Sequence, residues 1–138
     1  MKILLGVASN SMIVFVSKSY SGSISDKALT MQSIYLDEID PYCTLMVDKG
    51  FNIEEECTAR HIKLLIPPGK RGQSQMLPIA AKKTNEVAKM RISVEQIIRR
   101  LKCFRILPNE FPISSFSQLD DMVIICAALT NLLDPIYS

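Results

Sequence analysis

Short apolar runs alternate with polar, turn-forming residues along the first third of the chain. Residues 2–7 and 13–17 are rich in aliphatic and β-branched side chains, and the Ala-Ser-Asn-Ser segment between them favours a tight reversal. We therefore predict an antiparallel hairpin. A Ser-Gly-Ser break follows, after which Ser25 is placed to cap a helix over residues 25–32, with Asp26 near its positive N-terminal end.

A second pair of strands is predicted in the middle of the chain. Residues 44–47 form a continuous apolar run, typical of a strand that is buried on both faces, and the run ends at Asp48. Residues 53–60 have acids in the first turn and a base at the end, which indicates a short helix, and residues 63–66 read as a further strand. A strand, a helix and a strand in succession predict a parallel pair with a right-handed connection.

The last two fifths of the chain carry helical periodicity. Prolines and glycines at residues 67–72 predict an irregular basic loop, and a long helix is expected over residues 78–103. Its predicted apolar face consists of Val87, Met90, Val94, Ile97, Ile98 and Leu101. A final helix over residues 117–132 is apolar enough to be buried on most sides. Its apolar run is about half the roughly 20 residues that a membrane span needs, so no transmembrane segment is predicted.

Composition indicates a globular protein. The chain has 138 residues, of which 48% are hydrophobic and 22% charged, and it shows no repeat, low-complexity tract or dividing linker. We therefore expect one domain over residues 1–138. The four cysteines are widely spaced and form no CxxC pair, which fits reduced thiols in an intracellular protein better than a disulfide framework.

Positive charge is concentrated in one stretch. Residues 60–105 hold 12 of the 16 basic residues and only two acids, Glu86 and Glu95. This distribution suits a surface that contacts a polyanion. It equally suits a solvated helix face with basic flanks, and charge alone does not distinguish the two.

Asp48 and Glu95 are the candidate catalytic and metal-binding acids. Asp48 follows a predicted strand, where open α/β sheets place functional groups, and Glu95 lies in mid-helix with no capping role. Two such carboxylates suit Mg²⁺ or Mn²⁺. The structural alternatives are an ion pair of Glu95 with Arg91 or Arg99, its neighbours four residues away, and a simple turn residue at position 48.

Other kinds of chemistry have less support in the sequence. Cys57 and His61 are four residues apart, but a zinc site needs three or four ligands and no second pair has suitable spacing. A packed cysteine and a surface histidine are favoured instead. His61 is the only histidine, which leaves no Ser-His-Asp arrangement to propose, and no phosphate-binding glycine loop is present.

Several segments together resemble the DDE superfamily endonuclease domain of Harbinger-type transposases and of the host proteins derived from them. In chain order they are residues 2–8 (KILLGVA), 15–18 (FVSK), 22–27 (GSISDK), 46–51 (MVDKGF), 66–68 (IPP) with 71–72 (RG), 91–95 (RISVE), 104–107 (FRIL) and 126–132 (CAALTNL). Each fragment alone is weak evidence, but the shared order over nearly the whole chain is specific.

The resemblance implies an α/β, ribonuclease-H-like mixed sheet flanked by helices, in which Asp, Asp and Glu bind divalent metal and drive DNA cutting and joining. By motif, Asp48 resembles the second aspartate and Glu95 the glutamate. The resemblance also implies that nearby basic residues meet DNA phosphates; the candidates are Lys70, Arg71, Arg91, Arg99, Arg100 and Lys102. DNA is the implied partner, and the nucleus the implied location.

The first aspartate of the family pattern has no counterpart here. No Asp or Glu precedes Asp26, which belongs to a separate Ser-Asp-Lys motif. We therefore expect the chain to be the C-terminal two-thirds of such a domain, to lack the first, central strand, and to be weakly active or inactive alone. Its complement would be the missing N-terminal part or a separate DNA-binding protein. Two alternatives are a non-catalytic DNA-binding or protein-interaction module and a fragment without a stable fold.

Overall fold

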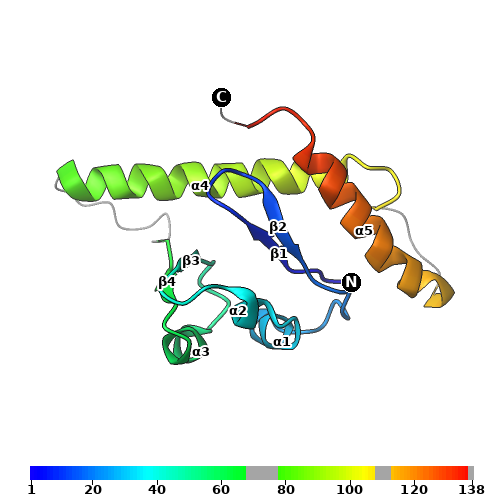
Figure 1. The fold of residues 1–138 in the computed structure, drawn as a ribbon, viewed down its shortest axis with the longest axis horizontal. Coiled ribbons are helices and arrows are strands. Elements are labelled where there is room, and N and C mark those ends of the chain that lie inside the picture. The colour runs from blue at the N-terminus through cyan, green and yellow to red at the C-terminus, as the bar shows by residue number, and fades with distance from the viewer. Residues whose placement is uncertain (68–77, 108–112, 137–138) are drawn as a thin grey trace. The chain divides into compact units, whose positions relative to one another are not determined.

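The computed structural model describes residues 1–67, 78–107 and 113–136, and the side chains of residues 78–84 and 113 are outside the description. The chain forms two compact units. The terminal unit comprises Met1–Gly22 and Lys89–Ser138, and the inserted unit comprises Ser23–Ala88. Helix α4 (Pro78–Lys102) belongs to both, because the boundary falls within it (Figure 1). Each unit is described by itself.

The terminal unit begins with the predicted hairpin. Strands β1 (Leu5–Val7) and β2 (Ile13–Val16) pair antiparallel, with Leu5 opposite Val16 and Gly6 opposite Phe15. In the turn, the Ser11 N–H donates to the Ala8 carbonyl at 2.9 Å, and the Ala8 N–H donates to the Met12 carbonyl at 2.9 Å. The hairpin prediction is confirmed.

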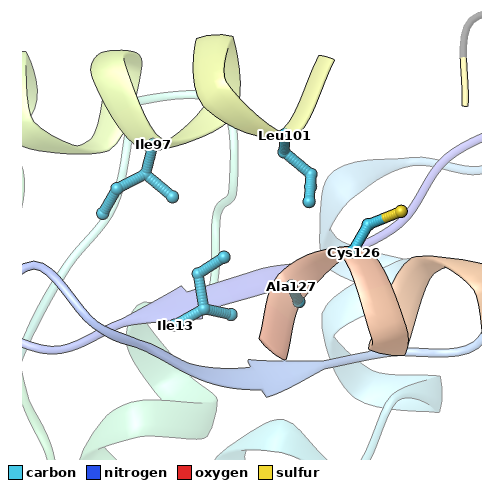
Figure 2. Close-up of a cluster of buried hydrophobic side chains, with 5 residues drawn as sticks. All are labelled: Ile13, Ile97, Leu101, Cys126 and Ala127. Atoms are coloured by element: carbon cyan, nitrogen blue, oxygen red, sulfur yellow. The ribbon is translucent and has the colours of Figure 1, made fainter. Parts of the chain in front are cut away.

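The core of the terminal unit joins the hairpin to two helices. Helix α5 (Phe116–Asn131), preceded by a single 3-10 turn (Ile113–Ser115), packs against β2. Figure 2 shows the buried cluster, which consists of Ile13, Ile97, Leu101, Cys126 and Ala127. The predicted apolar face of α4 is correct at Ile97 and Leu101, whereas Met90 is 40% exposed.

Helix α5 has the predicted position but not the predicted burial. Its buried residues lie on one stripe at helical spacing: Leu119, Val123, Cys126, Ala127 and Thr130. The rest of its surface carries apolar side chains in solvent, among them Ile124 at 54% and Ile125 at 58% exposure. The prediction of burial on most sides is therefore wrong, because the hairpin and α4 cover only one stripe of this helix among the described residues.

Asn131 completes the terminal unit by occupying the outer edge of β2. Its side-chain carbonyl oxygen accepts the Ile13 N–H at 2.8 Å, and its amide nitrogen donates to the Ile13 carbonyl at 2.9 Å. One side chain thus satisfies both backbone groups of a buried strand residue, as a neighbouring strand would. These two hydrogen bonds join the end of α5 to the hairpin.

The inserted unit contains the second predicted strand pair. Strands β3 (Thr44–Met46) and β4 (Lys63–Leu65) are parallel, with Thr44 opposite Lys63 and Met46 opposite Leu65, and helix α3 (Glu54–Ala59) connects them. The parallel prediction is confirmed. The expected burial of β3 on both faces is wrong, because Thr44 is exposed and Leu45 half-buried. The reason is that only one face of β3 packs against the core of the unit: Leu45 and Val47 lie on that face, and Thr44 lies on the other.

Two short helices precede this strand pair. Helix α1 (Asp26–Gln32) has the predicted cap, in which the Ser25 hydroxyl accepts the Ala28 N–H at 3.1 Å. Helix α2 (Tyr35–Glu38), which was not predicted, follows a left-handed residue, Ile34. The core of the unit consists of Leu36, Ile53, Cys57 and Ile62, with half-buried apolar neighbours that include Leu45, Phe51 and Leu64.

The architecture is therefore α/β, with helices accompanying two separate two-stranded sheets in the described residues. The single ribonuclease-H-like sheet stays a prediction. None of the described helices combines the length and the hydropathy that crossing a bilayer requires.

One ion pair gives the inserted unit a testable pH dependence. The Lys27 ammonium lies 2.8 Å from a carboxylate oxygen of Glu56, and this hydrogen bond raises the pKa of Lys27 and lowers the pKa of Glu56. The stabilisation from Glu56 is therefore present above its ordinary pKa of 4.5 and disappears as the pH falls through the lowered value. The Lys27 contribution is lost only in base, as the pH rises through its raised pKa.

We expect Glu56→Gln to reduce the stability near pH 6, and the difference from the unmodified chain to shrink as the pH falls below 4. Urea unfolding between pH 2 and pH 6 measures this. Glu54→Gln on the same helix is the matched control, because Glu54 is exposed and is expected to give a smaller difference at every pH. A pH-independent difference for Glu56→Gln would contradict the assignment.

Candidate functional site

Asp48 lies where the parallel pair ends. The Val47 N–H donates to the Leu65 carbonyl at 3.1 Å, which extends the ladder by one residue, and Asp48 is the first residue beyond it. The Phe51 N–H then donates to the Asp48 carbonyl at 3.2 Å and closes a turn. Asp48 is exposed, at the carboxyl end of both strands, as the sequence predicted.

Asp26 lies beside the same turn. Its Oδ2 atom is 3.9 Å from the position that a Cβ would take at Gly50, an ordinary contact distance. The first turn of α1 and the turn that follows β3 are therefore neighbours, and the two segments quoted for the family resemblance, residues 22–27 and 46–51, meet within the inserted unit.

Glu95 lies on the solvent face of α4. Ser93 and Ile97, two residues before and after it, are buried, and at about 100° per residue this places Glu95 on the opposite side of the helix. Three exposed basic residues share its face at helical spacing: Arg91, Arg99 and Lys102. Arg91 and Arg99, four residues before and after Glu95, are both exposed, so a surface ion pair with either of them stays the structural alternative.

The remaining basic candidates differ in their surroundings. Arg100 is half-buried, and its guanidinium donates to the Asp134 carbonyl at 2.7 Å, so it ties the segment after α5 to α4. Lys70 and Arg71 lie outside the described residues. Arg91, Arg99 and Lys102 are thus the basic candidates with exposed side chains in the described structure.

The carboxylates of Asp48 and Glu95 are the right type of ligand for a hard divalent cation, but they are too few to hold one without further ligands. Asp48 and Glu95 offer carboxylate oxygens, the ligands that Mg²⁺ and Mn²⁺ prefer. They belong to different units, however, and among the described residues no three His, Cys, Asp or Glu side chains form a metal-binding group. Asp48 and Glu95 would therefore supply two of the three carboxylates that the sequence resemblance implies.

The surroundings of Cys57 and His61 do not favour a zinc site. Cys57 is fully buried in the core of the inserted unit, and His61 is exposed. Burial, reinforced by the negative charge of Glu56, raises the pKa of the Cys57 thiol and so disfavours the thiolate that binds metal. All four cysteines are free, which agrees with the expectation of reduced thiols.

Tyr42 is a surface feature that the sequence analysis missed. Its ring stacks on that of His61 with 5.7 Å between centroids, and both side chains are exposed. The only sequence signal was the Asp40-Pro41 pair before it, which favours a turn. Nothing in the chain pattern connected Tyr42 with His61, 19 residues later.

Comparison with known proteins gives the family. No curated protein and no solved structure matches the chain. A family model described as DDE superfamily endonuclease matches residues 1–131, a range that includes both candidate acids and every described helix and strand. With that match covering nearly its whole length, the chain belongs to the DDE superfamily endonucleases.

Proposed function

We propose that this domain is a divalent-metal-dependent, transposase-type DNA endonuclease of the Harbinger class, with Asp48 and Glu95 as its metal-binding carboxylates. The observation that carries the proposal is the family match over residues 1–131, which includes both acids. When bound, Mg²⁺ or Mn²⁺ would activate the attacking oxygen and stabilise the leaving oxygen of a phosphodiester. Because the proposed substrate is DNA, the proposed location of the protein is the nucleus.

The protein's own residues have distinct roles in this proposal. The turn closed by the Phe51 N–H holds Asp48 at the end of the strand pair. On α4, Arg91 and Arg99 flank Glu95 by one helical turn on each side, which suits them to orient it and to meet DNA phosphates. Arg100 and Lys102 are further basic residues of α4 in the proposed surface, and Lys70 and Arg71, outside the described residues, stay candidates from the sequence.

The first carboxylate of the family pattern would come from outside residues 1–138. Residues 1–25 contain no Asp or Glu. The backbone of β1 suits pairing with a further strand. Leu4 and Ala8 hydrogen-bond toward β2, so the backbone N–H and C=O groups of Leu5 and Val7 point to the opposite edge of β1. We propose that a central strand with the first aspartate pairs there, and that the chain alone is weakly active or inactive.

The salt dependence of DNA binding tests the phosphate contacts of this proposal. We expect log Kd for duplex DNA to rise with log salt, because each neutralised phosphate releases counterions. Arg99→Gln should reduce the slope by about 1, as expected for one lost phosphate contact. Lys18→Gln removes the same charge from an exposed position outside the proposed surface and should leave the slope unchanged. Equal slopes for the unmodified, Arg99→Gln and Lys18→Gln chains would contradict the proposed DNA surface.

A second function is a transposase-derived module that binds DNA or protein without cutting. The observation in its favour is that only two carboxylates of the three are present and both are exposed. The nuclease and a DNA-binding module both predict salt-dependent DNA binding, so calorimetry with Mn²⁺ separates them. Metal binding that depends on Asp48 supports the nuclease, and DNA binding without metal binding supports the module.

A further inference from the structure

Tyr42 and His61 form a paired aromatic surface at the amino end of the parallel strands. The register that places Thr44 opposite Lys63 places Tyr42 opposite His61 two residues earlier. The Tyr42 N–H donates to the His61 carbonyl at 2.8 Å, which fixes the two backbones side by side. The rings stack with an angle of 19° between their planes, and Tyr42 is 84% exposed.

His61 occupies a backbone position that favours glycine. Its φ is 57°, in the left-handed region. The His61 N–H donates to the Thr58 carbonyl at 3.1 Å, and the Ile62 N–H to the Cys57 carbonyl at 2.9 Å, the two bonds of a Schellman motif at the end of α3. Glycine is the usual residue at this site because it has no Cβ to strain.

Tyr42 also occupies a position that favours glycine. Its φ is 68°, and the Cys43 N–H approaches the Asp40 carbonyl at 3.4 Å across a turn with Pro41 in second place. Proline followed by a positive φ is the pattern of a type II turn, whose third residue is preferably glycine or asparagine. Two strained positions in one small surface therefore both carry rings.

Fold stability gives little reason for either ring. An 84% exposed tyrosine gains little from burial, and the left-handed backbone costs energy at both positions. Strained backbone and departures from local rules concentrate where a protein binds or acts. The feature that remains is a stacked pair of near-parallel rings in solvent, on whose outer faces a flat ligand could continue the stack.

We infer that Tyr42 and His61 form a stacking platform for an unpaired DNA base. This inference rests on the proposed function, because the family supplies DNA as the substrate class. Aromatic faces stack any base, but a base inside a duplex has both faces covered, so the ligand is a single-stranded or locally opened strand. Tyr42 precedes Asp48 by six residues, at most about 20 Å of extended chain, so the platform would contact the strand within a few nucleotides of Asp48.

Glycine variants of the full chain test the platform without disturbing the backbone. We expect Tyr42→Gly and His61→Gly each to weaken binding of a fluorescein-labelled single-stranded oligonucleotide about tenfold, as expected from the loss of one stacking face. Their thermal midpoints should be unchanged or higher, because glycine relieves the positive φ. Tyr42→Phe should retain the affinity. Phe116→Ala, which removes a 43% exposed ring on α5, is the matched control and should bind normally.

The outcomes separate this inference from the proposed function. If both glycine variants bind single-stranded DNA as the unmodified chain does, the platform is wrong and the nuclease proposal stands. If the unmodified chain binds no DNA at any salt concentration, both are wrong. A fall in the thermal midpoint of both glycine variants shows that the rings stabilise the fold, and it also overturns the platform.

Discussion

Asp48→Ala is expected to weaken Mn²⁺ binding at least about 100-fold, more than the roughly 10-fold to 100-fold that follows loss of a residue that only supports a ligand. The reason is that a site with two protein carboxylates loses half of them. Isothermal calorimetry on the purified chain measures the affinity. Glu95→Ala should have an effect of similar size.

The double variant tests whether the two acids bind the same ion. If they do, Asp48→Ala with Glu95→Ala should bind scarcely more weakly than either single variant, because the first substitution has already destroyed the site. Additive losses would show two independent ions. Glu86→Ala, an exposed acid on the same helix, is the control and should bind Mn²⁺ normally. Unchanged binding in both single variants would refute the metal assignment.

Leu119→Ala is expected to lower the free energy of unfolding by about 2–5 kcal/mol, the range for buried leucines that leave a cavity. Leu119 is 0% exposed and lies on the buried stripe of α5. Leu129→Ala on the same helix is the matched control, because Leu129 is 46% exposed and should cost less than about 1 kcal/mol. Urea unfolding measures both. A loss at Leu129 as large as that at Leu119 would contradict the one-sided burial of α5.

Local patterns in the sequence predicted most elements of the fold. The Ser25 cap, the antiparallel hairpin and the parallel pair each depend on neighbouring residues or on a short connection, and each is confirmed. Burial was harder to predict, since it depends on what packs from elsewhere in the chain. Ile124 and Ile125 have the hydropathy of core residues, but both are more than half exposed, because the described residues cover only one stripe of α5.

The sequence predicted where each candidate acid lies in the fold, but not which residues come together. Asp48 follows a strand and Glu95 lies on α4, as expected, because strand ends and helix positions are readable from periodicity. Their proposed joint action on one metal ion does not follow from periodicity, since the acids are 47 positions apart and belong to different units. The pairing of Tyr42 with His61 was not predicted either, because the strand register that brings them together is a property of the folded sheet.

The bond between Asn131 and Ile13 sets an order for folding during synthesis. These residues are separated by 118 positions, so the hairpin emerges from the ribosome long before the side chain that completes its outer edge. The inserted unit, by contrast, is complete in sequence once Ala88 has emerged. Domains tend to fold as units while they are synthesised. We therefore expect the inserted unit to fold before the C-terminal part of the terminal unit has emerged to pack against the hairpin.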